Sequence, residues 1–420
     1  MAKCFVLLFL LTAGAAASPQ FEVSGYGTLG VVKTDSGVFG YRADYSKTGG
    51  VFADELDFGE SSNLGVQLDI LATDKLDFVV QGIYRDQENF TLDSALNLAF
   101  VRYTPEPNWS FRAGRTAFDL FLVTEYRDIN FAYPWAHVPN EIYGIFPHRF
   151  LDGVDVSYRR PLTDEITVSA KFFYGSTESV LTAYSSKNVE PLKFDDVFGV
   201  AIDFSAMSWD IAFNSTQVKF DSTIVQPLIE GMELLEQLPG SEFIWPNALQ
   251  LAHYLDLDNR KGKYTSISGQ YRFDKVTVMS EMAKVSSDSL TIRNVYSGYV
   301  SAIYHVSNHN FFATLAFADT KPFNLEKQNI DTVALAQIPG ADMLYEGAEF
   351  LLNYYNHNQK TLSVGWRWDF VENMSLKMQW DHTRISKDGS TFWQPADPSN
   401  YCSCNSGHVN TLFTNVSFLF

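Results

Sequence analysis

Hydrophobic and polar residues alternate along most of this chain, and this alternation is the feature that most limits its fold. In the clearest case, residues 361–370, large apolar side chains alternate with polar or small ones: Leu362, Val364, Trp366 and Trp368 against Ser363, Gly365, Arg367 and Asp369. Successive side chains of a β-strand point to opposite faces, so the pattern predicts strands with one apolar and one polar face. Strands of about ten residues with one charged face are typical of membrane barrels.

Alternating segments of this kind recur about sixteen times, separated by connections that are in turn short and long. The predicted strands are 21–33, 62–72, 76–86, 95–105, 109–116, 150–160, 165–176, 196–205, 208–219, 263–273, 276–286, 294–306, 310–319, 360–370, 374–384 and 409–420. The long connections are 34–61, 117–149, 177–195, 220–262, 320–359 and 385–408. We therefore expect an all-β fold, an antiparallel up-and-down transmembrane β-barrel with short periplasmic turns and long extracellular loops.

The first residues have the composition of an export signal. Lys3 is followed by the apolar run from Phe5 to Leu11, and Ala15, Ala16 and Ala17 then offer small residues for cleavage. We expect residues 1–17 to be a signal peptide and residues 18–420 to form one barrel domain. No apolar stretch reaches the roughly 18 residues that a spanning helix needs, which leaves a closed barrel as the way for an exported chain to enter a membrane.

Composition excludes several classes of function. The net charge of −18 argues against a nucleic-acid partner, since phosphate binding relies on clustered Lys and Arg. The eight His residues form no recognisable metal or catalytic motif, and no Gly-rich phosphate loop is present, so we expect no metal, no cofactor and no catalytic residue. Cys402 and Cys404 lie in the last long connection, where an exported protein could form a small, strained disulfide.

The last strand carries a more specific signal. Leu412, Val416, Phe418 and Phe420 share one face, and the chain ends on Phe420, although soluble chains rarely end on an exposed aromatic residue. Together with Ala113-Gly114-Arg115 before a long third loop, this end makes the mature chain resemble the Gram-negative outer-membrane porins. The resemblance implies that Phe418 and Phe420 belong to an assembly signal. It also implies a homotrimer in contact with outer-membrane lipid and lipopolysaccharide, and small hydrophilic solutes as cargo.

The third loop, roughly 116–148, is too apolar for a solvated loop. It contains Phe118, Leu120, Phe121, Leu122, Phe131, Tyr133, Trp135, Ile142 and Tyr143, which would form an exposed patch unless they packed against protein. The porin resemblance implies that this loop folds into the barrel and narrows it. Its acidic residues are Asp119, Glu125, Asp128 and Glu141, and the candidate wall cations are Arg85, Arg112, Arg115, Arg159, Arg272 and Arg367.

Carboxylates opposed to guanidinium groups would create a transverse field that orients solutes and discriminates among ions. Ordinary surface ion pairs, which are worth little individually, are the alternative reading of the same residues. Arg102 and Arg115 occupy positions in the alternation where their neighbours are apolar. The sequence therefore leaves open whether their side chains point into the barrel or out of it.

Two other long loops contain a similar sequence. Gln237-Leu238-Pro239-Gly240 recurs as Gln337-Ile338-Pro339-Gly340, and in each case the Pro-Gly follows an apolar run with helical spacing. We expect helices in loops 220–262 and 320–359 that end at the Pro-Gly and could pack together over the mouth of the barrel. Chance similarity between two amphipathic loops is the competing explanation.

These observations lead to one main functional hypothesis and two alternatives. The main one is a passive, water-filled diffusion channel of the cell outer membrane with a mild preference for cations, set by Asp119, Glu125 and Asp128 in the third loop. The first alternative is a barrel whose loops occlude the lumen and which acts in surface recognition or as a sheath for a partner. The second is an outer-membrane hydrolase with His305 or His382 as the base.

Overall fold

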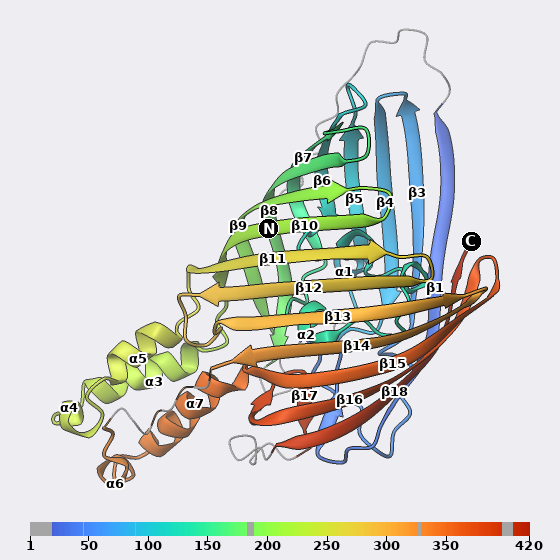
Figure 1. Cartoon of the computed structure of the whole chain (residues 1–420). Coiled ribbons are helices and arrows are strands. Elements are labelled where there is room, and N and C mark those ends of the chain that lie inside the picture. The colour runs from blue at the N-terminus through green and yellow to red at the C-terminus, as the bar shows by residue number, and fades with distance from the viewer. Residues whose placement is uncertain are drawn as a thin grey trace.

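The computed structural model describes residues 19–420 except 45, 89, 183–188, 322, 324, 326–328 and 397–405. Of residues 353 and 387–390 it describes the backbone but not the side chains. Sixteen antiparallel strands form a closed barrel (Figure 1) in the order β1-β18-β16-β15-β14-β13-β12-β11-β10-β9-β8-β7-β6-β5-β4-β3. Their bounds are β1 (Gln20–Thr34), β3 (Asn63–Thr73), β4 (Leu76–Arg85), β5 (Leu96–Tyr103), β6 (Trp109–Ala117), β7 (Phe150–Pro161), β8 (Thr167–Thr182), β9 (Val189–Ser205), β10 (Trp209–Asp221), β11 (Arg260–Arg272), β12 (Val276–Ser287), β13 (Val295–Val306), β14 (His309–Thr320), β15 (His357–Val371), β16 (Met374–Ser390) and β18 (Gly407–Leu419). Each predicted strand overlaps one of these, so the predicted fold class is confirmed.

One predicted long loop is wrong. The segment 177–195 is mostly strand, because β8 and β9 remain paired from Thr177↔Phe194 to Thr182↔Val189. Its polar residues do not prevent pairing, since backbone hydrogen bonds form whatever the side chain. Two short strands, β2 (Phe39–Tyr41) and β17 (Trp393–Pro395), also lie within predicted loops and pair with each other outside the barrel sheet.

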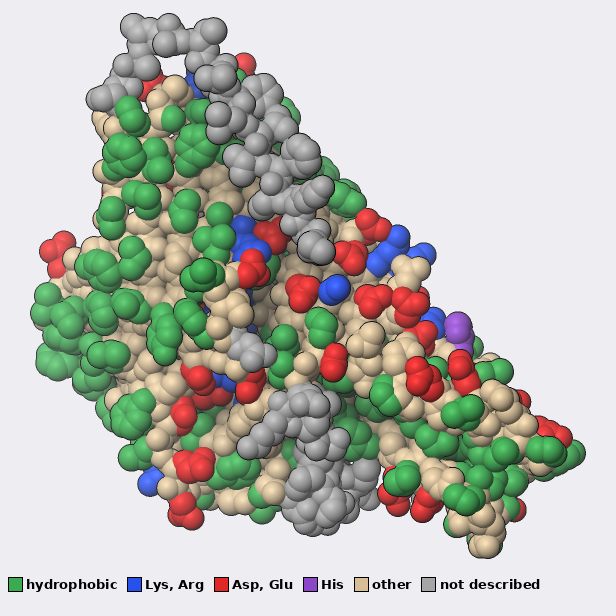
Figure 2. Space-filling model, turned by 180° about the vertical axis from the view of Figure 1, so that it is seen from behind, with side chains coloured by type: hydrophobic (Ala, Val, Ile, Leu, Met, Phe, Trp, Pro, Cys, Tyr) green, Lys and Arg blue, Asp and Glu red, His purple; other side chains and the backbone are tan. Residues whose placement is uncertain are grey.

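Alternation places the apolar faces outside and the polar faces inside. Outward side chains such as Leu29 and Val23 are 70% and 67% exposed, whereas inward ones such as Ser301 and Ser375 are fully buried. Hydrophobic side chains cover much of the outer face seen in Figure 2. Outward aromatic rings pack in pairs near strand ends, for example Trp109 with Tyr158, whose ring centroids are 4.5 Å apart. Such an apolar band edged by aromatic residues suits a lipid environment. Among the described residues, no helix has both the length and the apolarity to cross a membrane.

The two ends of the chain meet where the barrel closes. Strands β1 and β18 pair, and the backbone N–H and C=O groups of Gly25 and Phe420 exchange hydrogen bonds of 2.8 and 3.0 Å. The Phe420 ring lies over Gly25, where any Cβ atom would overlap it. The terminal residue therefore completes the sheet seam as well as presenting an apolar ring outside.

Deleting Phe420 should slow barrel folding strongly, because the deletion removes both seam hydrogen bonds and the ring that covers Gly25. The measurement is the fraction of folded barrel against time after dilution from urea into detergent, read by electrophoretic mobility without heating. Phe273→Ala is the matched control, since Phe273 is similarly exposed (57% against 59%) but lies in a short turn. Equal folding rates for the two variants would contradict an assembly role for the C-terminus.

The two loops with the shared Pro-Gly sequence are helical, as predicted. One contains α3 (Gln226–Glu236), α4 (Ser241–Ile244) and α5 (Ala248–Leu255), and the other α6 (Thr332–Leu335) and α7 (Ala341–Tyr354). Gly240 and Gly340 both adopt a left-handed conformation, with φ of 85° and 82°, directly before α4 and α7, so the similar sequences encode the same turn between two helices.

The two helical loops also pack against each other. A Cβ atom on Gly231 of α3 would collide with Leu344 of α7, and the Asp331 N–H donates to the Ile244 carbonyl at 2.8 Å. Figure 1 shows the helices projecting together beyond the strand ends. Mutual packing is thus confirmed, whereas a vestibule over the mouth remains a prediction.

Candidate functional site: charged contacts of the third loop

The third loop, residues 118–149 between β6 and β7, folds into the barrel interior. It contains the short helices η1 (Thr124–Tyr126), η2 (Asn130–Ala132) and α2 (Asn140–Tyr143). Trp135 is fully buried, and its indole N–H lies 3.2 Å from Ser301 Oγ on β13 and 3.1 Å from Thr314 Oγ1 on β14. The apolar residues that marked this loop in the sequence therefore pack against the inner wall, as expected.

Polar side chains of β15 and β16 hold the middle of the loop. Lys377 is fully buried, and its ammonium group donates to the carbonyls of Tyr133 at 2.6 Å and Trp135 at 3.0 Å. Arg367 Nη1 also donates to the Tyr133 carbonyl, at 3.0 Å. Because burying a charge is costly without several hydrogen bonds, these contacts specify the path of the loop across the barrel.

Glu141, which the sequence predicted at the constriction, is buried against the barrel wall. It is 1% exposed, and its carboxylate accepts hydrogen bonds from Gln359 at 2.6 Å and from the Thr361 hydroxyl on β15. Burial raises its pKa above the ordinary value for a glutamate. The residue instead fixes α2 to the wall, so it cannot act on ions in open water.

A buried glutamate that the sequence reading missed holds the loop on β12, three strands along the wall from β15. Glu281 on β12 is fully buried and accepts hydrogen bonds from the Tyr143 hydroxyl at 3.0 Å and the Leu122 N–H at 3.3 Å. The available signal was its position between the apolar Met279 and Ala283 on the inward parity of the strand. A charged residue there required a partner, but nothing local indicated which one.

Two of the predicted loop carboxylates lie against cations of the barrel wall. Lys171 Nζ on β8 is 2.8 Å from Asp119 and 3.0 Å from Glu125. Arg112 on β6 contacts Glu125 at 3.5 Å and the wall residue Asp155 at 2.9 Å. Lys171, and then Arg112, hold the pKa of Glu125 below its ordinary value. Loop acids and wall cations are therefore opposed, and they are close enough to form direct ion pairs.

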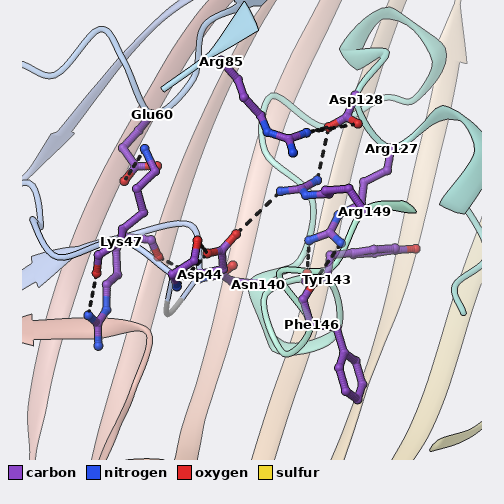
Figure 3. A network of polar contacts seen from close by, with 12 residues as sticks. Asp44, Lys47, Glu60, Arg85, Arg127, Asp128, Asn140, Tyr143, Phe146 and Arg149 are labelled. Atoms are coloured by element: carbon purple, nitrogen blue, oxygen red, sulfur yellow. Dashed lines mark hydrogen bonds and ion pairs between the residues drawn. The ribbon is translucent and has the colours of Figure 1, made fainter. Parts of the chain in front are cut away.

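The third carboxylate, Asp128, belongs to a second charged cluster, shown in Figure 3. It lies 3.4 Å from Arg85 of β4 and 3.2 Å from Arg149 at the end of the loop, and Arg149 also contacts Asp44 at 3.6 Å. Burial alone would raise the pKa of Asp128, but the two arginines outweigh it and the pKa lies below its ordinary value. The sequence identified Arg85 and Asp128 but missed Arg149 and Asp44.

A polar cavity with about 150 Å³ of space for water-sized molecules adjoins this cluster. It is lined by the first loop, the third loop and the walls at β1, β3 and β4, including Lys47, Glu60, Arg85, Arg127 and Asp128. Arg127 donates to the carbonyls of Phe146, at 3.1 Å, and Tyr143. Both charge signs therefore line one water-accessible space inside the barrel.

The remaining predicted wall cations divide between the two faces. Arg272 faces inward and pairs with Asp210 at 2.8 Å, and Arg159 has inward parity near the short-turn end. Arg115, a predicted wall cation whose facing the sequence also left open, points outward: it pairs at 2.8 Å with Asp152, which lies on the same face of β7 as the exposed Val154. The regular alternation of β6 carries Arg115 to the outside. Arg102, whose facing the sequence left open, points inward and pairs with Asp77, with Nε 3.1 Å from its carboxylate.

The remaining candidate residues are His305 and His382, which the sequence offered as catalytic bases, and Cys402 and Cys404. His305 lies between the Thr277 hydroxyl at 2.8 Å and Asn310 at 2.6 Å, and His382 contacts Asn410 at 2.9 Å. No group of three or more His, Cys, Asp or Glu side chains among the described residues is arranged to hold a metal ion. Cys402 and Cys404 lie outside the residues that the structure describes.

Comparisons with known proteins identify the architecture. No protein-family model matches the chain, and no curated protein is found to match it. Its fold is similar to that of the outer membrane channel DcaP of Acinetobacter baumannii (12% identity, 96% of this chain and 97% of that chain, TM-score 0.54). It is also similar to Salmonella typhi OmpF (10%, 95% and 97%, 0.51) and to an anion-selective porin from Comamonas acidovorans (10%, 96% and 100%, 0.50). The chain therefore has the sixteen-stranded barrel fold of outer-membrane porins.

Proposed function

We propose that this protein is a passive diffusion channel of the outer membrane for small hydrophilic solutes and ions. The observation that supports it best is the third loop inside the barrel, with Asp119 and Glu125 in direct ion pairs with Lys171 and Arg112 of the polar inner wall. Opposed charges at a narrow point act through low-dielectric surroundings, so they order water and orient dipolar solutes. The proposal includes a signal peptide at 1–17, assembly as a homotrimer, contact with lipid and lipopolysaccharide, and no catalytic step.

We further propose a mild preference for cations. The helical parts of loops 220–262 and 320–359, residues 222–259 and 329–356, carry Asp and Glu but no Lys or Arg, and they project from one end of the barrel. Arg260, Lys261, Lys321 and Lys327 lie in the flanking parts of the loops. An acidic entrance raises the local concentration of cations, an effect that falls as salt screens charges beyond about 8–10 Å. At the third loop, acids and bases are more nearly balanced, which limits the preference.

A second candidate function rests on how firmly the third loop is held. Glu141, Glu281 and Lys377 connect it to β15, β12 and β16 on one side of the barrel. Asp119 pairs with Lys171 of β8 on the other side. A loop attached on both sides is also what a permanently occluded barrel would contain, and such a barrel would act in surface recognition or as a partner sheath.

Reconstitution into planar bilayers separates the two functions. A channel should give ohmic single-channel steps and, in a salt gradient, a reversal potential on the cation side. An occluded barrel that is correctly folded by circular dichroism and electrophoretic mobility would give no steps at any voltage, and the channel proposal would fail.

The cation preference should increase with pH between about 6 and 8. Burial raises the pKa of Glu60 to about 7, with Lys47 at 3.8 Å acting against the rise and Asp44, Asp57 and Asp86 adding to it. Above that pH the carboxyl ionises and adds a negative charge to the polar cavity. Burial lowers the pKa of His137 in the same cavity to about 4, so this imidazole stays neutral throughout.

The measurement is the reversal potential in a fixed salt gradient at pH 6, 7 and 8. Glu60→Gln should remove much of the change with pH, whereas Glu88→Gln, at another acid of the same mouth, should not. A pH dependence that survives unchanged in Glu60→Gln would assign it to other groups.

A further inference from the structure

An apolar cavity lies inside the barrel, apart from the charged clusters. It is enclosed between the third loop, through Phe118 and Phe146, and the wall at β8 to β13, through Leu192, Phe194 and Phe220. The cavity offers about 60 Å³ of space, and its lining is almost wholly apolar. Such a space is unusual in an interior whose inward face is otherwise polar. Because polar solutes gain nothing from apolar walls, it favours a solute with a hydrocarbon part.

The charged groups around this cavity are all basic. Among its described lining residues there is no Asp or Glu, although the chain has 49 acidic residues, and the charged side chains are those of Arg293 and Lys263. A second cavity of about 230 Å³ adjoins it, lined by Ser287, Ser289, Leu290, Arg293, Asn294, Tyr296 and Lys321, again without an acid in the described chain. Ser287 and Arg293 line both cavities, so Arg293 lies at the boundary between them.

Arg293 has unused capacity to bind an anion. Its Nη1 atom is buried and has no hydrogen-bond partner among the described residues. The guanidinium carbon lies 5.6 Å from the centroid of the Phe323 ring, and burial lowers the pKa of Arg293 from its ordinary value. A buried donor without a partner is costly, and a guanidinium group fits a carboxylate with two parallel hydrogen bonds.

We propose that the cavity binds the short hydrocarbon chain of a small carboxylate, with Arg293 binding its carboxylate group. The inference extends the proposed channel by naming one class of solute, but the binding itself does not require conduction. The volume limits the chain, because a cavity of about 150 Å³ is needed to hold a benzene molecule and this one is smaller. A chain of three or four carbons fits this limit better than a long acyl chain.

The test is isothermal titration of the purified full-length protein in detergent with acetate, butanoate and pentanoate at pH 7. Each methylene group that enters an apolar site contributes about 0.8 kcal/mol, or roughly a fourfold gain in affinity. Pentanoate should therefore bind about 60-fold more tightly than acetate. The neutral analogue pentan-1-ol should bind much more weakly than pentanoate, since it lacks the anionic group.

Arg293→Gln should weaken pentanoate binding about tenfold or more, because it removes a charge-assisted bidentate contact. Arg260→Gln is the matched control: it removes the same charge from an arginine that contacts Asp256 outside the cavity, and it should leave pentanoate affinity unchanged. Equal affinities for acetate and pentanoate, or equal effects of the two substitutions, would overturn the proposal. Pentanoate binding by a barrel that gives no conductance would support this site while rejecting the channel.

Discussion

Replacing residues 119–148 by a short turn is expected to raise the single-channel conductance several-fold. The third loop occupies the barrel interior and is bonded to several walls, so its removal leaves an interior whose width the strands alone determine. The replacement is sterically simple, because Ala117 and Phe150 are already paired across β6 and β7 and a tight turn can join them. Conductance in planar bilayers at high salt measures the change.

The deletion also removes the hydrogen-bond partners of two buried charged residues of the wall, so the variant must be checked for correct folding. Lys377 and Glu281 would lose the loop atoms that they bind, but both would then be reached by water in a wider lumen. Replacing residues 226–255, a helical segment of equal length, is the matched control. Its ends are close, with Gln226 Nε2 3.2 Å from Asp256, and it lies outside the barrel, so conductance at high salt should not change. Unchanged conductance after loss of 119–148 would mean that this loop does not limit the pore.

Neutralising Asp119, Glu125 and Asp128 together, as D119N/E125Q/D128N, should reverse the ion preference from cations to anions. Each of these carboxylates contacts a cation, so the change removes three negative charges and leaves Lys171, Arg112, Arg85 and Arg149 with only Asp155 and Asp44 as acidic partners. The cations then outnumber the acids at the third loop, so the local potential becomes positive. The reversal potential in a salt gradient measures it.

The shift should shrink as salt rises, because the Debye length falls from about 10 Å at 0.1 M to about 3 Å at 1 M. D93N/D152N/E178Q removes the same charge from the outside of the barrel, where these residues line an exposed cavity with Arg115, and should leave the reversal potential nearly unchanged. If the two triple variants behave alike, the third loop does not line the conducting path.

The barrel could be predicted from the sequence because the residues of each strand show the alternation that identifies it. Alternation at period two is a local property, and a closed sheet in which every strand has one apolar face fixes which side faces outward. Gly240 and Gly340 are local in the same sense, since a left-handed turn residue between two helices favours glycine wherever the rest of the chain lies. For that reason the strands, the helical loops and the apolar character of the third loop could be predicted from the residues alone.

The destinations of individual charges could not be predicted in this way. Arg115 has the parity of its apolar neighbours and follows it outward to Asp152, although its charge suggested the pore. Nothing in the sequence distinguishes the carboxylate of Glu141 from that of Asp119. In the structure, however, Glu141 is bound by Thr361, a residue 220 positions away. A charge finds its partner through contacts across the barrel, and those depend on the path of the whole loop. The sequence by itself therefore determined the barrel and the facing of its walls, whereas only the tertiary structure decided which charges are paired, buried or open to water, because that depends on long-range packing that no local pattern encodes.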